Sequence, residues 1–350
     1  MSSAGKSNLG RALFDATQMA RTAWFGAQYG LAQRLAPPLD APLPRPGTLP
    51  GWPVILRDLR TLQQQDWQNV QAGYYPRPAD TFASPMKMLR NAARFFADVP
   101  AVNLRRREGR NNDVFTDDTR TKRPRYYLQN FHYQSDGWLT DGSAARYDHQ
   151  VEVLFTGGAD AMRRQALLPV QDWLHVRGAD GANLLDIGCG TARFLFDVKR
   201  ARPEMPVIGL DMSEAYLKRA RRNLRRWPGG HQMILANAEA MPFVDGGGPS
   251  LVTCIFLFHE LPRKVRRQVA GEIARILRPG GRAVLVDSIR IGDHAPYDAL
   301  LDRFPAAFHE PYYKDYIRDD LESVAVGHGL VHVSTTRAFF SRVMTFDKPD

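Results

Sequence analysis

A glycine-rich turn after an apolar strand is the part of this sequence best suited to chemistry. In the run LLDIGCGTARF, Asp186, Gly188, Gly190 and Ala192 stand at alternate positions after two apolar residues. Glycine has no Cβ, so the backbone of such a turn can approach a ligand closely, and a helix beginning there offers free N–H groups. The pattern predicts a buried strand, a ligand-binding turn and the start of a helix.

A second acidic residue, Asp211, follows the next apolar stretch, residues 206–210. In α/β folds that bind nucleosides, a carboxylate at this position accepts hydrogen bonds from the ribose hydroxyls. The two features together predict a site for a cofactor that contains a nucleoside. A nicotinamide or flavin site would show G-x-G-x-x-G directly after the strand, whereas here the glycines follow Asp186 as D-x-G-x-G-x-A.

This run resembles motif I of the class I S-adenosylmethionine-dependent methyltransferases. Three further matches follow in the order of that family: Asp211 at its ribose-binding acid, AEAMPF (238–243) at its adenine loop and RILRPGG (275–281) at the turn before its fifth strand. The ubiquinone and menaquinone C-methyltransferase branch is the most similar. The resemblance covers roughly the last 200 residues. It implies S-adenosylmethionine as cofactor and an enzyme that transfers its methyl group to a small molecule.

The resemblance also implies which residues bind the cofactor. They are Asp186, Gly188, Cys189, Gly190, Asp211, Met212, Asn237, Ala238, Phe256 and, before the first strand, Tyr147. Two positions depart from the family pattern. Ala192 replaces the third glycine, and Asn237 replaces the acid of the adenine loop, although its amide oxygen can still accept a hydrogen bond from an amine.

The segment FLFHELP, residues 256–262, follows the fourth expected strand and should lie near the transferred methyl group. Methyl transfer from a sulfonium is an in-line displacement, so an enzyme mainly aligns the acceptor and excludes water. His259 is a candidate general base because imidazole titrates near neutral pH. The alternative is that His259 only caps a helix or bonds to nearby backbone.

A second candidate group lies in FHEPYYKDY, residues 308–316. His309, Glu310 and Tyr313 are further catalytic candidates there, with Tyr313 as an orienting group; the alternative is lid packing without contact to the acceptor. Aromatic residues in this segment suit a planar or apolar acceptor. We expect the acceptor pocket between this segment and FLFHELP, under a roof of aromatic residues from 126–138, and we expect no metal site.

The last 200 residues or so alternate between strand and helix, which predicts an α/β fold with a Rossmann-like, seven-stranded, mostly parallel sheet. A helix over 160–176 should precede it, and a short connection at 337–338 predicts an antiparallel last strand. The expected strands are 183–187, 207–210, 232–236, 251–256, 283–287, 331–336 and 339–346.

Residues 1–125 are expected to form a mainly helical N-terminal extension, and 126–350 the methyltransferase domain with its aromatic pre-strand lid. Apolar residues at 9, 13, 16, 20, 24, 27, 31 and 35 predict an amphipathic helix. We expect its apolar face to pack on another element or a second subunit, with contact to a membrane surface as the alternative. A proline-rich connection over 36–47, a helix over 84–98 and a polar, basic loop over 103–125 should follow.

The composition, 44% hydrophobic and 24% charged over 350 residues, is that of a soluble globular protein. Its two cysteines, Cys189 and Cys254, show no disulfide or metal-ligand spacing, which favours a reducing, cytoplasmic location. The net charge of +10 comes largely from three clusters of basic residues within 105–125, 218–226 and 263–267. These clusters are solvated helix faces or a surface for nucleic acid or membrane.

Three functions remain open at this point. A small-molecule methyltransferase is favoured, because the run after the fourth strand is not D/N-P-P-Y/F and neither cysteine suits a nucleophile in a pocket loop. An RNA or protein methyltransferase that docks through its arginines is the second. A scaffold that binds the cofactor without turnover is the third.

Overall fold

A central sheet of seven strands organises the computed structural model, which describes residues 8–37, 49–78, 85–227 and 229–350. The strand order is β3-β2-β1-β4-β5-β7-β6. Strands β1 to β5 are parallel, whereas β7 runs antiparallel to both β5 and β6. The strands are β1 (Leu184–Ile187), β2 (Val207–Asp211), β3 (His231–Leu235), β4 (Leu251–Ile255), β5 (Arg282–Ser288), β6 (Val331–Ala338) and β7 (Ser341–Asp347). All seven expected strands and the antiparallel end of the sheet are confirmed.

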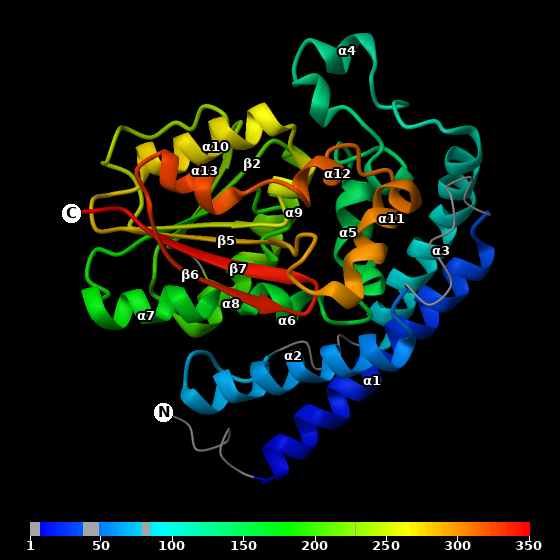
Figure 1. Ribbon diagram of the computed structural model, residues 1–350, viewed down its shortest axis with the longest axis horizontal. Coiled ribbons are helices and arrows are strands. Elements are labelled where there is room, and N and C mark those ends of the chain that lie inside the picture. The colour runs from blue at the N-terminus through cyan, green and yellow to red at the C-terminus, as the bar shows by residue number, and fades with distance from the viewer. Residues whose placement is uncertain (1–7, 38–48, 79–84, 228) are drawn as a thin grey trace.

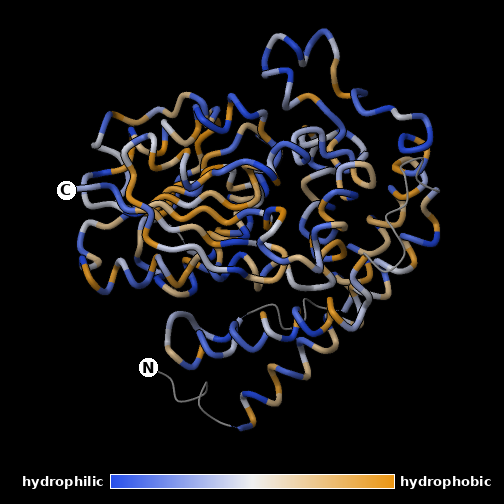
Figure 2. The backbone as a smooth tube through the Cα atoms, in the orientation of Figure 1, coloured by the Kyte–Doolittle hydropathy of each residue, from blue (hydrophilic) through white to orange (hydrophobic). Residues whose placement is uncertain are grey.

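Helices cover both faces of the sheet, and more helices gather beyond the carboxyl ends of β1 to β5 (Figure 1). Those on the two faces are α6 (Ala159–Arg164), α7 (Leu167–Arg177), α8 (Arg193–Ala201), α9 (Glu214–Leu224), α10 (Arg263–Ile276) and α13 (Leu321–Gly327). Those beyond the strand ends include α5 (Asp141–Leu154), α11 (Asp298–Phe308), α12 (Tyr313–Tyr316) and the short turns η2 (Arg125–Tyr127), η3 (Phe131–Tyr133), η4 (Phe258–Glu260) and η5 (Ala295–Tyr297). Hydrophobic residues concentrate along the central strands (Figure 2), as expected for parallel strands buried on both faces.

In its described residues, the N-terminal region includes the α-helices α1 (Asn8–Leu35), α2 (Trp52–Ala72), α3 (Pro85–Glu108) and α4 (Asp117–Arg120). Part of the loop expected over 103–125 is therefore helical, because α3 continues past Pro100 to Glu108. The helix expected over 160–176 is divided into α6 and α7. Most of the proline-rich connection expected over 36–47 lies outside the described residues.

A buried ion pair joins α2 to α6. Both guanidinium and carboxylate are almost fully enclosed, and Arg164 Nη2 donates to Asp66 Oδ2 over 2.7 Å while Nε donates to Oδ1 over 2.9 Å. The Tyr75 hydroxyl donates to the same carboxylate over 2.7 Å. Leu59, Leu62 and Trp67 of α2 belong to the same buried apolar cluster as the sheet. Helix α2 is therefore packed into the core that includes the sheet.

The predicted apolar face of α1 does not pack on the protein. Leu9, Leu13, Leu31 and Leu35 are about half exposed or more. The buried face lies further round the helix and includes polar residues that pair with α5: Arg21 contacts Glu152 over 3.2 Å, and Gln28 contacts His149 over 2.8 Å. Counting apolar residues alone selected the wrong face. In the described part of the chain, no helix is long and apolar enough to cross a membrane.

Candidate active site

The glycine turn leaves β1 and folds back against the end of β2. The N–H groups of Gly188 and Cys189 both donate to the Leu210 carbonyl, over 2.8 and 3.0 Å. Gly188 has φ +67° and Gly190 φ +54°, a region where a Cβ costs energy. Ala192 also adopts φ +61° at the start of α8, so the residue that replaces the third glycine keeps a glycine-like backbone at a cost of roughly 1–2 kcal/mol.

Asp211, the last residue of β2, is hydrogen-bonded to the glycine turn. Its Oδ2 accepts a hydrogen bond from Gly190 N over 2.9 Å and its Oδ1 accepts one from Ser213 N over 2.8 Å. Burial raises the pKa of Asp211, while these backbone donors lower it. The carboxylate is therefore held at the pocket wall by two N–H groups and retains acceptor capacity for hydroxyl donors.

Asn237 and Glu239 form the third strand-end group. Asn237 Oδ1 accepts a hydrogen bond from Glu239 N over 3.0 Å, and Asn237 Nδ2 donates to Glu239 Oε1 over 2.9 Å. The Tyr126 hydroxyl donates to the same Oε1 over 2.6 Å. Glu239 thus holds the side chains of Asn237 and Tyr126, both of which line the pocket.

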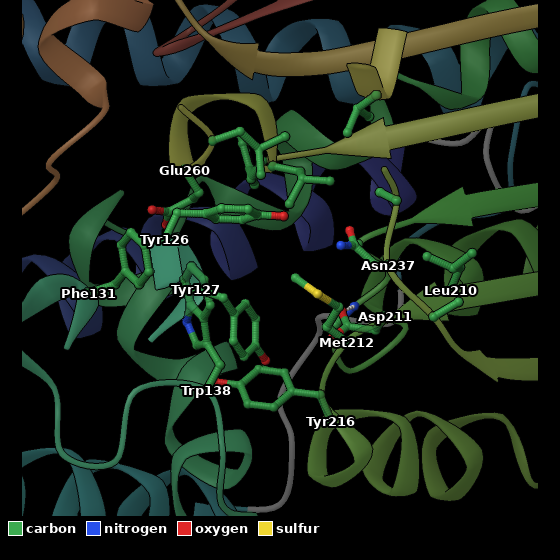
Figure 3. A pocket seen from close by; sticks show the side chains of 18 of the residues that line it. Tyr126, Tyr127, Phe131, Trp138, Leu210, Asp211, Met212, Tyr216, Asn237 and Glu260 are labelled. Carbon is green, nitrogen blue, oxygen red and sulfur yellow. Dashed lines mark hydrogen bonds between the residues drawn. The ribbon is translucent and has the colours of Figure 1, made fainter. Parts of the chain in front are cut away.

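Aromatic side chains from the pre-strand segment close the pocket over these groups. The rings of Phe131 and Trp138 stack with centroids 4.2 Å apart, and the Trp138 carbonyl accepts a hydrogen bond from Ser213 Oγ over 2.5 Å. Tyr127 and Trp138 face Asp211 and Met212 across the opening (Figure 3). The buried Trp138 Nε1 has no hydrogen-bond partner in the described residues, so one donor in this wall is left for a ligand.

The pocket encloses an empty space of about 800 Å³, part of it open to solvent, and collects eight of the ten predicted cofactor residues. These eight are Tyr147, Gly188, Gly190, Asp211, Met212, Asn237, Ala238 and Phe256. Asp186 and Cys189 lie behind the wall. Asp186 accepts a hydrogen bond from Thr253 Oγ1 over 2.7 Å and so ties β1 to β4, and burial raises its pKa to about 7.

A second, larger cavity of about 1380 Å³, also partly open, adjoins the first. The two share Tyr147, Phe256 and Glu260. His259 and Tyr313 line the larger cavity, as predicted, but the expected roof is wrong: of residues 126–138, only His132 lines it. The walls come instead from α1, α2, α5 and α11, and include Tyr29, Trp52, Ile55, Val151, Leu154, Phe155, Leu300, Leu301, Phe304 and Phe308.

Comparison with known proteins identifies the part of the chain that carries the first pocket. Residues 184–281, from the start of β1 to the turn before β5, match the family model described as a methyltransferase domain. This stretch is a class I methyltransferase domain. The strand order, the glycine turn and the acid at the end of β2 agree with that assignment, and the resemblance seen in the sequence is confirmed.

Individual relatives match a limited part of the chain. The ubiquinone/menaquinone biosynthesis C-methyltransferase of Geobacter sulfurreducens is 29% identical over 147 residues, 41% of this chain and 54% of that protein. An O-methyltransferase of Penicillium expansum is 29% identical over 161 residues, 45% of this chain and 55% of the relative. A crystal structure of geranyl diphosphate C-methyltransferase from Streptomyces coelicolor shares 15% identity over 51% of this chain and 79% of that one, with a TM-score of 0.39. The chain thus spans about half the length of the curated relatives it matches.

His259 of the methyltransferase domain is tied to a carboxylate. Its Nδ1 lies 2.6 Å from Asp287 Oδ1, and Glu260 Oε1 lies 3.6 Å from its Nε2. Burial lowers the pKa of His259, but the Asp287 and Glu260 carboxylates outweigh that effect and raise it to about 9. The imidazole carries a proton at neutral pH, which argues against the predicted general base.

The other three catalytic candidates lie in different environments. His309 faces away from the cavity, between Asn111 and Gln129 at 3.3 and 3.1 Å, and burial lowers its pKa to about 4. Glu310 is buried against His132 and Glu260, and both burial and the Glu260 carboxylate raise its pKa. Tyr313 donates to or accepts from Ser288 Oγ over 2.6 Å at the cavity wall.

Several residues of the site were missed in the sequence: His132, Glu239, Asp287 and the cavity walls on α1 and α2. Glu239 could have been found from the sequence, because it is a carboxylate two residues after Asn237, the position at which the family pattern has an acid. The others become neighbours only through tertiary packing, which no local pattern reports.

The tie between Asp287 and His259 predicts a titration. Asp287→Asn removes the carboxylate that contributes most to holding the imidazole protonated and leaves burial and the weaker effect of Glu260, so the pKa of His259 should fall well below about 9. The measurement is an NMR titration of the histidine ring signals in the two proteins. Asp302→Asn, at an exposed ion pair with Arg318, is the control. A His259 titration that is equal in all three proteins would contradict this electrostatic assignment.

Proposed function

We propose that this protein transfers the methyl group of S-adenosylmethionine to an apolar or planar small molecule. The observation that carries the proposal is the junction of the two cavities at Tyr147, Phe256 and Glu260. A sulfonium cofactor with its ribose on Asp211 and its adenine beside Asn237 would place its methyl group toward that junction. An acceptor in the larger cavity would then stand in line with it, shielded from water.

The cofactor itself would supply the activated methyl group, and the chain's residues would bind and orient it. Asp211 offers oxygen acceptors to ribose hydroxyls, and the glycine turn allows close approach of the backbone. The unpartnered Trp138 N–H and the surrounding rings suit a ligand with both polar and flat parts. Water exclusion would come from the aromatic segment over the opening.

The apolar walls of the larger cavity favour a small-molecule acceptor over RNA or protein. The third basic cluster also argues against docking of a polyanion, because Asp315 and Asp319 pair with Arg263, Arg266 and Arg267. A scaffold without turnover would bind the cofactor and transfer nothing. A cytoplasmic location stays a prediction, supported by two buried, free cysteines.

A further proposal concerns α1, whose exposed stripe of Leu9, Leu13, Leu31 and Leu35 lies on the helix that also lines the larger cavity through Tyr29. We propose that this stripe contacts a membrane surface, where an apolar acceptor would partition. Flotation with vesicles that contain anionic phospholipid should recover the protein, and Leu13→Gln with Leu31→Gln should abolish recovery. The control Val176→Gln, which changes an exposed apolar residue on α7, should leave recovery unchanged. Recovery unaffected by the α1 changes, or a homodimer that they dissociate, would overturn the proposal.

Cofactor binding can be tested by calorimetry with S-adenosylhomocysteine. Asp211→Ala removes a charged acceptor, worth on the order of 1.5–3 kcal/mol, and should weaken binding about tenfold or more. Asn237→Asp should also weaken it, because it sets a carboxylate against Glu239 and removes the amide donor. Adding Glu239→Gln to Asn237→Asp should restore binding. If Asp211→Ala and Asn237→Asp both bind as tightly as the parent, the cofactor assignment fails.

Acceptor binding is tested by transfer of label from S-adenosylmethionine to components of a cell extract, followed by identification of the product by mass spectrometry. With that acceptor, Ile55→Trp should raise KM several-fold by filling the cavity, while cofactor affinity stays unchanged. Gln64→Trp, on an exposed part of the same helix, is the matched control. Absence of any labelled product, or an unchanged KM in Ile55→Trp, would refute the assignment of this cavity.

A further inference from the structure

Three side chains from separate parts of the chain converge beside the junction of the two cavities. His132 comes from η3, Glu260 from η4, and Glu310 from the segment after α11. One ligand atom of each lies within 4.8 Å of the others. His132 Nε2 is 3.1 Å from Glu310 Oε1. One imidazole and two carboxylates in this arrangement are a set of donors that could share one cation.

The carboxylates of this cluster are buried without adequate partners. Glu310 is 1% exposed and Glu260 6%. Neither oxygen of Glu310, nor Oε2 of Glu260, accepts a well-formed hydrogen bond within the described residues. An ionised carboxylate in this state is costly, because its few contacts do not replace the hydrogen bonds that water would make. These carboxylate oxygens therefore point to a bound cation.

The neighbouring side chains offer little positive charge to Glu260 and Glu310. In the part of the chain that the structure describes, the ion-pair contacts of Glu260 and Glu310 are with histidines alone, His259 at 3.6 Å and His132 at 3.1 Å. His259 is shared with a third carboxylate, Asp287. Asp287, Glu260 and Glu310 thus surround one small region in which His259 is the shared positive charge, and a divalent cation bound between Glu260 and Glu310 would stabilise the ionised form of both.

We propose that His132, Glu260 and Glu310 bind one divalent transition-metal ion. An imidazole with two carboxylates suits Zn²⁺, Mn²⁺, Fe²⁺ or Co²⁺, whereas Mg²⁺ and Ca²⁺ prefer oxygen ligands alone. Three protein ligands leave at least one coordination position for water or substrate. No metal site was expected from the sequence, because these residues stand far apart in the chain and follow no ligand spacing.

The location of the cluster indicates what the ion would hold. His132 and Glu260 line the larger cavity, and Glu260 also lines the cofactor pocket. The open coordination position would face the cavity, and there the ion would bind an oxygen or nitrogen atom of the acceptor. This role rests on the proposed function, whereas binding of the ion itself does not.

The test is metal binding by the full chain, without any methyl transfer. Protein treated with a chelator and then dialysed is titrated with Co²⁺ and with Mn²⁺, followed by calorimetry, by the visible absorption of Co²⁺ and by elemental analysis. We expect one ion per chain, bound more tightly than Mg²⁺. Glu310→Gln and His132→Gln should each weaken binding at least tenfold.

Two control variants separate the cluster from its surroundings. His309→Gln changes the histidine next to Glu310, whose ring lies between Asn111 and Gln129, and Asp302→Asn changes an exposed carboxylate. Both should bind as the parent does. Circular dichroism tests whether each variant is folded. If Glu310→Gln or His132→Gln does not fold, Glu260→Gln takes its place as the cluster variant.

The proposal is overturned if the parent protein binds no stoichiometric ion, or if the cluster variants bind like the controls; the two glutamates would then share a proton instead. One ion per chain together with no transfer to any acceptor would leave the metal site standing and refute the proposed function. Transfer that is unaffected by chelation and by Glu310→Gln would leave the proposed function standing and remove the ion's role in binding the acceptor.

Discussion

The Leu210 carbonyl, which accepts hydrogen bonds from both Gly188 N and Cys189 N, is the interaction on which the site depends. It bends the chain back across the end of β2 immediately after β1. The in-register pairing of β1 with β2 and β4 then brings Asp211 and the segment after β4 to the same edge. With Gly190 N bonded to Asp211, the turn and the acid form one rigid wall. Tyr127 and Trp138 face this wall across the pocket (Figure 3).

The cofactor pocket and the larger cavity are made by different parts of the chain. The matched methyltransferase domain, residues 184–281, contains most of the strand-end residues of the first pocket. The walls of the second come mainly from outside it: Tyr29 and Trp52 from the N-terminal helices, Leu154 from α5 and Phe304 from α11. Under the proposed function, the choice of acceptor would depend mainly on residues outside 184–281. The buried Asp66–Arg164 pair joins α2 to α6, and removal of either partner would leave an uncompensated buried charge.

Elements with a strong local signal were predictable from the sequence. The seven strands, the glycine turn, Asp211 and the position of α1 follow from short apolar runs, turn residues and a helical period, which act over neighbouring residues. The buried face of α1 was not predictable in this way, because Arg21 and Gln28 are buried by pairing with Glu152 and His149 on α5. Polar partners of this kind are settled by packing between distant segments.

The chemistry of the site shows the same limit. His259 was found from its position after β4, but its protonated state depends on Asp287 of β5, which the sequence does not place beside it. His132, Glu260 and Glu310 carry no common motif, and only the fold brings them together. Local patterns therefore located the wall of the first pocket, whereas the larger cavity depends on contacts between segments far apart in the chain.

The most direct test of the proposed cofactor site is a crystal structure of the protein with S-adenosylhomocysteine. We expect the ribose hydroxyls on Asp211, the adenine beside Asn237 under the aromatic segment, and the sulfur directed toward Tyr147, Phe256 and Glu260. Binding of the nucleoside elsewhere, or a sulfur atom directed away from the larger cavity, would contradict this arrangement.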